Sequence, residues 1–368
     1  MRVHVFCGDQ IYSNIYIYIY ICVSLMRMYV NYMSKSKKAA VEDFEEALRV
    51  NQIDSSTYIG AHPLRLPLAG ARGVYGGHFC AQALLVAILS APGYVPASFH
   101  SQFLAPGSSK IPMTYKVSNL DTDQTTACKK IMVTQNDERR FSCVVQLCKP
   151  SARVPEGSRN APLPEVQVNP TDLHHKYPDP SELSAVHHTD YIRNAYSVEF
   201  TDMASSKHEL AQPAALRWVT VFGGIVSSAK QFKNSIFNLV GLADLSDSFI
   251  LTTLARVLHI PWNPTEGSEH YDDLQNGLDL LLISSNILHL LHYNCMSLDH
   301  HLYFHTDSFE SFDICRDWLT FSYQFMHVGN NRSLVRGFFY DRDGRNVATV
   351  VQEGLTHFHD GIAQMAKL

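Results

Sequence analysis

Two periods of hydrophobic residues run along the chain and predict different elements. Residues Gly76–Ser90 (GGHFCAQALLVAILS) are apolar on nearly every side, which is typical of a helix enclosed by other structure. A second mostly apolar run, Leu245–Leu258, predicts another such helix that begins near Asp247. A short amphipathic helix is expected near the start of the fold, from the spacing of Val41, Phe44 and Leu48.

Strict alternation of apolar and polar residues predicts strands in both halves of the chain. The polar pair Asn136-Asp137 predicts a turn, and Asp341–Gly344 between two alternating runs predicts a hairpin. Strands joined by hairpins outnumber helices, so we expect an α+β fold with an antiparallel sheet. The expected strands are Met113–Ser118, Phe141–Leu147, Leu319–Phe325, Leu334–Tyr340 and Asn346–Gln352.

The two halves resemble each other, which indicates an internal duplication. Without a gap, Lys130 aligns with Arg336, Asp137 with Asp343, and Val145-Gln146 with Val351-Gln352. At a slightly different offset, His100 aligns with His300. The expected units are a first repeat over 40–149, a proline-rich linker over 150–190, and a second repeat over 191–360 with an insertion at about 261–294.

The two ends of the chain differ from the rest. Residues 1–32 contain Ile15–Ile21 (IYIYIYI), which a translated dinucleotide repeat would produce, so we expect an extension that adds nothing to the fold. A signal anchor and an edge strand are the rival interpretations, although the apolar stretch is too short to span a bilayer. The tail, 361–368, ends in Ala366-Lys367-Leu368, a close variant of the S-K-L peroxisomal address.

Composition narrows the class of protein. The 368 residues are 46% apolar and 18% charged with a formal charge of −5, which excludes a disordered chain and a basic nucleic-acid binder. The eight cysteines form no C-x-x-C pair, so neither a disulfide framework nor a zinc ribbon is expected and a reducing compartment is indicated. The histidines near Asp299 and after His357 close no ligand set, and no metal site is predicted.

Six short motifs follow one another along the chain. They are GVYGGHFCAQAL (Gly73–Leu84), FHSQFLAPG (Phe99–Gly107), LSD (Leu245–Asp247), SLDH (Ser297–His300), LVRG (Leu334–Gly337) and VQEG (Val351–Gly354). They stand in the order found in acyl-CoA thioesterase II enzymes, and the chain resembles the peroxisomal branch of that family. The resemblance covers about Asp43 to Gly354 and implies a double hotdog fold, in which each of two repeats has a long helix wrapped by a curved antiparallel sheet.

The resemblance also implies a catalytic set, with Asp247, Ser297 and Gln352 holding a water against the thioester carbonyl. In this set Asp247 would accept the proton, and the other two would orient the water. Backbone amides at the start of the helix near Asp247, or near Gly76-Gly77, would stabilise the oxyanion. Taken alone, Asp247 is more typical of a helix N-cap and Gln352 of a strand residue satisfied by backbone.

The implied activity is hydrolysis of medium- to long-chain acyl-CoA, with no cofactor other than the coenzyme A of the substrate. No G-x-S-x-G occurs, which argues against a serine-nucleophile hydrolase. A non-catalytic acyl-CoA-binding protein is the alternative. Expected partners are the peroxisomal import receptor and further copies of the chain in a homo-oligomer, with the peroxisomal matrix as location and no stable membrane insertion. Candidate substrate-binding residues are Gly76, Gly77, His100, Lys129, Lys130 and Arg336.

Overall fold

The computed structural model describes the part of the chain that contains both repeats. The described residues are 43–67, 71–150, 166–168, 173–183, 185–189, 191–197, 218–248, 250–254 and 293–358. The predicted N-terminal extension, nearly all of the predicted insertion and the C-terminal tripeptide lie outside these residues.

The predicted enclosed helix of the first repeat is α3, Gly76–Leu89. Twelve of its fourteen residues are buried, so the apolar sequence matches an environment that surrounds the helix. The short opening helix α2, Phe44–Leu48, buries its first and last residues. The side chain of Asp43 caps this helix by accepting a hydrogen bond from the Glu45 N–H. Both predictions are confirmed in kind, although α2 is only five residues long.

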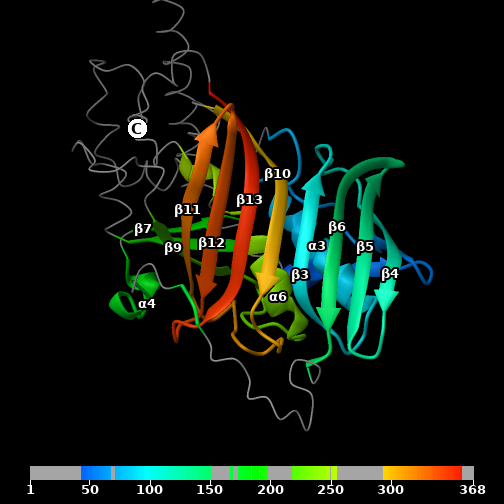
Figure 1. Cartoon of the computed structure of the whole chain (residues 1–368), viewed down its shortest axis with the longest axis horizontal. Helices are drawn as coiled ribbons and strands as arrows, with labels where there is room; N and C mark the ends of the chain where they lie inside the picture. The colour runs from blue at the N-terminus through cyan, green and yellow to red at the C-terminus, as the bar shows by residue number, and fades with distance from the viewer. Residues whose placement is uncertain are drawn as a thin grey trace, which may run out of the picture. The chain divides into compact units, whose positions relative to one another are not determined.

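Among the described residues, one antiparallel sheet of thirteen strands runs through both repeats. Its order is β1-β2-β4-β5-β6-β3-β10-β13-β12-β11-β9-β8-β7, and the repeats join where β3 pairs with β10 (Figure 1). The bounds are β1 Val50–Gln52, β2 Thr57–Gly60, β3 Val95–Phe103, β4 Thr114–Thr122, β5 Thr126–Gln135, β6 Glu138–Cys148, β7 Ala185–Thr189, β8 Ile192–Tyr196, β9 Val219–Ile225, β10 Tyr293–Phe304, β11 Leu319–Gly329, β12 Arg332–Tyr340 and β13 Asn346–Phe358.

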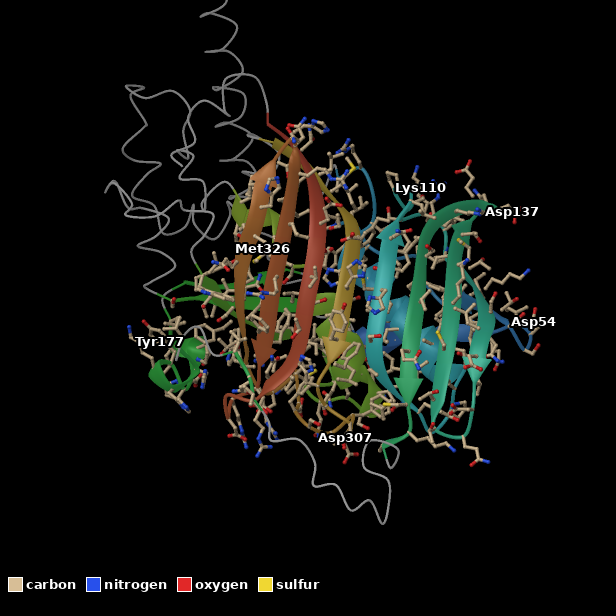
Figure 2. All side chains as sticks on the ribbon, viewed as in Figure 1. Asp54, Lys110, Asp137, Tyr177, Asp307 and Met326 are labelled. Carbon is tan, nitrogen blue, oxygen red and sulfur yellow. The ribbon has the colours of Figure 1, made fainter. Side chains whose placement is uncertain are left out.

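Two hairpins close through two-residue turns with positive φ at both positions. Asn136 and Asp137 have φ of 50° and 63°, and Asp137 lies at the tip between β5 and β6 (Figure 2). Asn330 and Asn331 do the same between β11 and β12. Asn and Asp tolerate this conformation, which matches the right-handed twist of the flanking strands. The predicted turn at Asn136-Asp137 is therefore confirmed.

The buried helix of the second repeat is not the one predicted. It is α6, Ile236–Leu245, which packs against α3. The chain turns at Ser246–Ser248, and a 3-10 turn at Leu251–Thr253 followed by the helical residue Leu254 comes next among the described residues. The prediction that a helix begins near Asp247 is wrong, because the residues S-D-S at its start compete for backbone hydrogen bonds and end a helix here. Residues 255–258 of the predicted helix lie outside the described residues.

The gapless alignment of the repeats is also wrong by one residue in the last strand. β5 and β6 are joined by two residues, whereas the hairpin from β12 to β13 contains five, 341–345. The pairing partner of Phe99 is Val145, and that of His300 is Gln352, so Gln352 corresponds to Val145 and not to Gln146. Because successive side chains face opposite sides of a sheet, an alignment that is wrong by one residue compares a side chain on one face with a side chain on the other face.

The second repeat begins earlier than the predicted linker boundary. Within 150–190 the structure places a short helix α4, Leu173–Lys176, a 3-10 turn at Pro180–Glu182 and the edge strand β7. β7 pairs with β8 and belongs to the sheet. Most of the prolines of this region precede residue 180, so the segment after it is free to join a sheet.

Two general features complete the fold. Among the described residues, Cys80, Cys128, Cys143, Cys148 and Cys315 are free thiols. Among those same residues, no helix has the length and hydrophobicity needed to cross a membrane.

Candidate active site

Asp247, Ser297 and Gln352 are separated by up to 105 residues along the chain, yet their side chains meet. Gln352 Nε2 donates to Asp247 Oδ1 at 2.8 Å and to Ser297 Oγ at 2.7 Å. Ser297 Oγ in turn donates to the same Asp247 oxygen at 3.0 Å. The structure therefore brings the three sequence-predicted residues into one hydrogen-bonded triangle.

Each of the three comes from a different element of the second repeat. Asp247 lies two residues beyond the end of α6. Ser297 lies in β10 at the register shift before Asp299, an irregularity of the kind that redirects a side chain beside an active site. Gln352 is fully buried in β13, whereas Asp247 and Ser297 are partly exposed. The carboxylate and hydroxyl are thus the accessible members of the triangle.

The first repeat contributes the beginning of α3. A Cβ on Gly76 would lie 2.4 Å from Asp247 Oδ2, so only glycine allows this close approach. The backbone N–H of Gly77 donates to the Asp247 carboxylate. Asp247 therefore does act at a helix start, but at that of α3 in the other repeat; it lies in the turn that follows α6 and not at the start of the helix predicted for it.

Burial raises the pKa of Asp247 from 3.8 to about 6. The hydrogen bonds from Ser297 and Gln352 lower that pKa, the negative charge of Asp244 raises it, and the Gly77 N–H lowers it. Desolvation outweighs the hydrogen bonds because the ionised form loses water on burial. The result is a carboxylate that is ionised above about pH 6 and is more basic than an ordinary aspartate.

His300 is a site residue that the sequence reasoning missed. It is fully buried, its Nδ1 lies 2.8 Å from Gln352 Oε1, and its Nε2 lies 2.7 Å from Ser246 Oγ. Burial lowers the pKa of His300 to about 4, so the imidazole is neutral at physiological pH. The only signal in the sequence is the place of His300 within the SLDH motif, among the histidines near Asp299 that form no set of metal ligands.

A second buried pair joins the two helices beside the triangle. His78 Nδ1 on α3 lies 2.6 Å from Asp244 Oδ1 on α6, and both side chains are almost entirely buried. Tyr75 donates its hydroxyl to the backbone oxygen of Asp244 at 2.8 Å. These contacts hold the start of α3 against the end of α6, where Asp247 lies.

Four of the six predicted substrate-binding residues lie away from this site, and three of the four, His100, Lys130 and Arg336, are on the outer face of the sheet. His100 pairs with His301, Lys130 with Val144, and Arg336 with Val351. On each strand the residues directly beside these three are buried and face the helices. Because successive side chains of a strand point to opposite faces, His100, Lys130 and Arg336 project from the outer face of the sheet. The predicted alignment of His100 with His300 is therefore wrong, because His100 corresponds to His301. The Nδ1 atoms of His100 and His301 lie 3.3 Å apart.

Lys129 also lies away from the triangle, whereas the two glycines contact Asp247, which is one of its members. Lys129 pairs with Val145 in the first repeat, and its Nζ donates to Asn119 at 2.9 Å. Gly76 and Gly77 contact Asp247 as described, so they are the two members of the predicted substrate-binding set that the structure places at the site.

The part of the chain that the structure describes contains no group of three or more histidine, cysteine, aspartate or glutamate side chains arranged to hold a metal ion. The arrangement at Asp247 is instead suited to binding a water molecule, because it offers a carboxylate base next to a hydroxyl and a buried amide.

Comparison with family models defines the class of protein. Residues 64–148 match the acyl-CoA thioesterase N-terminal domain and residues 170–356 match the acyl-CoA thioesterase C-terminal domain, together more than half of the chain. The chain belongs to the acyl-CoA thioesterase family, which confirms the predicted class of enzyme.

Individual relatives agree with this membership. The peroxisomal acyl-coenzyme A thioester hydrolase 1 of Saccharomyces cerevisiae is 22% identical over 352 residues, which cover 87% of this chain and 95% of the yeast protein. The crystal structure of acyl-CoA thioesterase II TesB2 from Mycobacterium marinum is 19% identical with a TM-score of 0.57, and the match covers 86% of this chain and 98% of that one.

A further structural match supports the fold. A protein of unknown function with a hot dog fold from Alicyclobacillus acidocaldarius is 15% identical with a TM-score of 0.55, over 85% of this chain and 97% of that one. Two buried helices against one antiparallel sheet, with the two repeats joined at β3 and β10, form a double hotdog of the α+β class. The predicted fold class is confirmed.

Proposed function

We propose that the protein hydrolyses fatty acyl-CoA to a free fatty acid and coenzyme A, with Asp247, Ser297 and Gln352 as its catalytic residues. The observation that carries the proposal is the closed triangle of hydrogen bonds around a partly exposed carboxylate whose pKa is about 6. A general base near its working pH is well matched to the abstraction of a proton from water.

In the proposed reaction, the Asp247 carboxylate takes a proton from a water whose oxygen forms a bond to the thioester carbonyl carbon. Ser297 and Gln352 fix the carboxylate and the water so that the water's lone pair points at that carbon. The tetrahedral intermediate then breaks its C–S bond. The thiol leaves readily because its pKa is about 8.5, and the proton held by Asp247 returns to the leaving sulfur or to solvent.

The developing oxyanion needs hydrogen-bond donors, and we assign them to the start of α3. This helix has fourteen residues, its N-cap Tyr75 makes no side-chain cap, and its first N–H groups lie at Gly76 and Gly77 beside Asp247. The Gly77 N–H donates to the Asp247 carboxylate, so the Gly76 N–H and the positive end of the helix dipole are the groups that would favour a negative oxygen there. The end of α6 presents carbonyl groups, which excludes the other predicted donor position.

The cellular setting is proposed on separate grounds. Medium- to long-chain acyl substrates, a peroxisomal matrix location, an import receptor that reads Ala366-Lys367-Leu368, and a homo-oligomer complete the proposal. The yeast relative is named for peroxisomes, which supports the location. The proposed reaction requires no cofactor beyond the coenzyme A of the substrate. Removal of the last three residues should leave a fluorescent fusion of the full chain in the cytosol.

The activity is tested by release of free coenzyme A from a series of acyl-CoAs by wild type and by Asp247→Asn. Asparagine has nearly the same shape as aspartate but cannot accept the proton, so kcat should fall about 10³-fold. Thermal unfolding of the variant checks that it is folded. Full activity in Asp247→Asn would discard the base, and binding of acyl-CoA without turnover by wild type would establish the non-catalytic alternative.

A further inference from the structure

We propose that His300 is a positioning residue that sets the orientation of the Gln352 side-chain amide, and through it the hydrogen bonds on Asp247. The inference rests on the proposed function and adds a fourth residue to the site. It is carried by a continuous chain of contacts from Ser246 through His300 and Gln352 to Asp247, with every link at 2.8 Å or less.

The hydrogens of this chain admit one consistent arrangement with an ionised Asp247. Gln352 Nε2 has two hydrogens, which go to Asp247 and Ser297, so Gln352 Oε1 must accept from His300. His300 therefore carries its hydrogen on Nδ1. The neutral ring then presents a lone pair at Nε2, which accepts from the hydroxyl of Ser246, so the one hydrogen of that hydroxyl is directed at the ring and not at the Ala243 carbonyl oxygen 2.9 Å away.

The opposite orientation of the amide is disfavoured at both ends. A flipped Gln352 would direct Oε1 toward the Asp247 carboxylate, where two acceptors would face each other, and would direct its N–H groups at a ring nitrogen that already carries hydrogen. The imidazole cannot rotate away to relieve this, because His300 is fully buried. The backbone of His300 is also held in place, since its carbonyl oxygen accepts from Ser101 Oγ at 2.7 Å.

Packing alone does not require a histidine at this place. The corresponding residue of the first repeat is Phe99, which is fully buried and pairs with Val145 as His300 pairs with Gln352. An aromatic hydrocarbon thus occupies the same structural position where the strand partner is apolar. The imidazole is present where that partner has an oxygen that needs a donor.

The test compares His300→Phe with His300→Asn. Phenylalanine fills the space without a donor, so kcat should fall about 10- to 100-fold while KM stays within about threefold. Asparagine carries its N–H on an atom bonded to Cγ, as His300 Nδ1 is, so it should stay within about threefold of wild-type kcat. His301→Phe, one residue along β10 on the outer face, is the matched control and should leave the activity unchanged.

The pH profile gives a readout that a purely structural role would not move. Loss of the Gln352 hydrogen bond should raise the pKa of Asp247, so the acid limb of kcat/KM should move to higher pH in His300→Phe and stay in place in His300→Asn. His300 itself stays neutral over pH 5–8. The other ionisable groups that act on Asp247 or are acted on by it are unchanged in these variants: Asp244, Tyr75, Cys80 and Cys295.

Equal losses in His300→Phe and His300→Asn with an unmoved acid limb would reduce His300 to a packing residue and overturn the inference. Wild-type activity in both variants would overturn it as well. An inactive wild-type enzyme would instead contradict the proposed function, so the two failures are distinguishable.

Discussion

The ends of α3 and α6 are built alike but present different side chains. Ser90 and Ser246 each donate a backbone N–H to the carbonyl four residues back, and each hydroxyl oxygen lies within 2.9 Å of the carbonyl oxygen three residues back. The next residue is Ala91 in the first repeat and Asp247 in the second. The matching strand positions are Pro96 and Ser297, Phe99 and His300, and Val145 and Gln352, with the same register shift after Pro96 and after Ser297.

The comparison shows what the backbone supplies and what it does not. Both repeats have the same helix end, the same strand irregularity and the same buried strand pair, so the scaffold of the site is present twice. In the first repeat alanine, proline, phenylalanine and valine fill it. In the second, four polar side chains satisfy one another by hydrogen bonds, which is the condition for burying them at a tolerable cost.

Among exchanges of residues between the two repeats, the largest expected effect comes from giving the second repeat the valine that the first repeat has at the position of Gln352. In Gln352→Val, Asp247 and Ser297 lose their shared donor and His300 loses its acceptor, so kcat should fall about 10²- to 10³-fold. Steady-state kinetics with an acyl-CoA that the wild type turns over would measure this loss.

The control for Gln352→Val is Gln146→Val. A gapless alignment of the repeats makes Gln146 the counterpart of Gln352, whereas the strand pairing assigns that place to Val145. Gln146→Val should therefore keep the wild-type kcat. A comparable loss in both variants would show that the comparison between the repeats is wrong.

The reverse exchange should damage stability rather than activity. Phe99→His puts an imidazole where its strand partner is Val145 and where Phe141 packs at a ring distance of 6.2 Å. Its buried nitrogens would find no partner in this apolar place and apolar contacts would be lost, so the free energy of unfolding should fall by about 2–3 kcal/mol.

Urea unfolding of Phe99→His measures that change, and activity per folded molecule should equal that of the wild type. Because a buried, unpartnered histidine has a lowered pKa, the deficit should grow as the pH falls below about 6.5. A variant as stable as wild type would mean that the apolar character of this position in the first repeat is not needed.

Sequence patterns predicted five of the thirteen strands described in the sheet, and one of the two buried helices. Alternation located β4, β6, β11, β12 and β13, and the apolar run after Tyr75 located α3. α6 escaped because Asn238 and Gly241 are poor helix formers, so only its enclosure by the sheet and α3 stabilises it. The wrong prediction that a helix begins near Asp247 followed from the same neglect of tertiary context.

The site itself was predicted through motif resemblance, and the limits of that approach follow from geometry. Asp247, Ser297 and Gln352 stood in motifs, and the structure brings them together. Lys130, Arg336 and His100 were chosen for charge and alignment, and no pattern along one strand says which face of a two-sided sheet holds the ligand. His300 was overlooked because its role appears only when the hydrogens of Gln352 are assigned.

A smaller effect is expected from pH, because only the second repeat places an ionisable group at the helix end. The working form of Asp247 is the carboxylate, and its pKa is about 6. kcat/KM should therefore level off above pH 7 and reach roughly a tenth of its plateau at pH 5. The same raised pKa means that the ionised group costs the fold stability above about pH 6, a cost that disappears as the pH falls.

Chromatographic measurement of released coenzyme A from pH 5 to 8.5 avoids the pH dependence of thiol reagents. The residual activity of Asp247→Asn provides the control and should show no acid limb from this group. An acid limb of the same midpoint in wild type and Asp247→Asn would assign it to another group, and the carboxylate would lose its proposed role as the base.

The smallest effect concerns Ser297, where the first repeat has Pro96. The Ser297 hydroxyl accepts from Gln352 and donates to Asp247, so it is an intermediate link between two groups that also bond directly. Ser297→Ala removes this link but leaves the direct contact, so kcat should fall only about tenfold. Ser297→Thr keeps the hydroxyl and should stay within about threefold of wild type. If the alanine variant lost as much as Gln352→Val, the link through Ser297 would matter as much as the direct contact between Gln352 and Asp247, and the assignment of Ser297 as an intermediate link of small effect would be wrong.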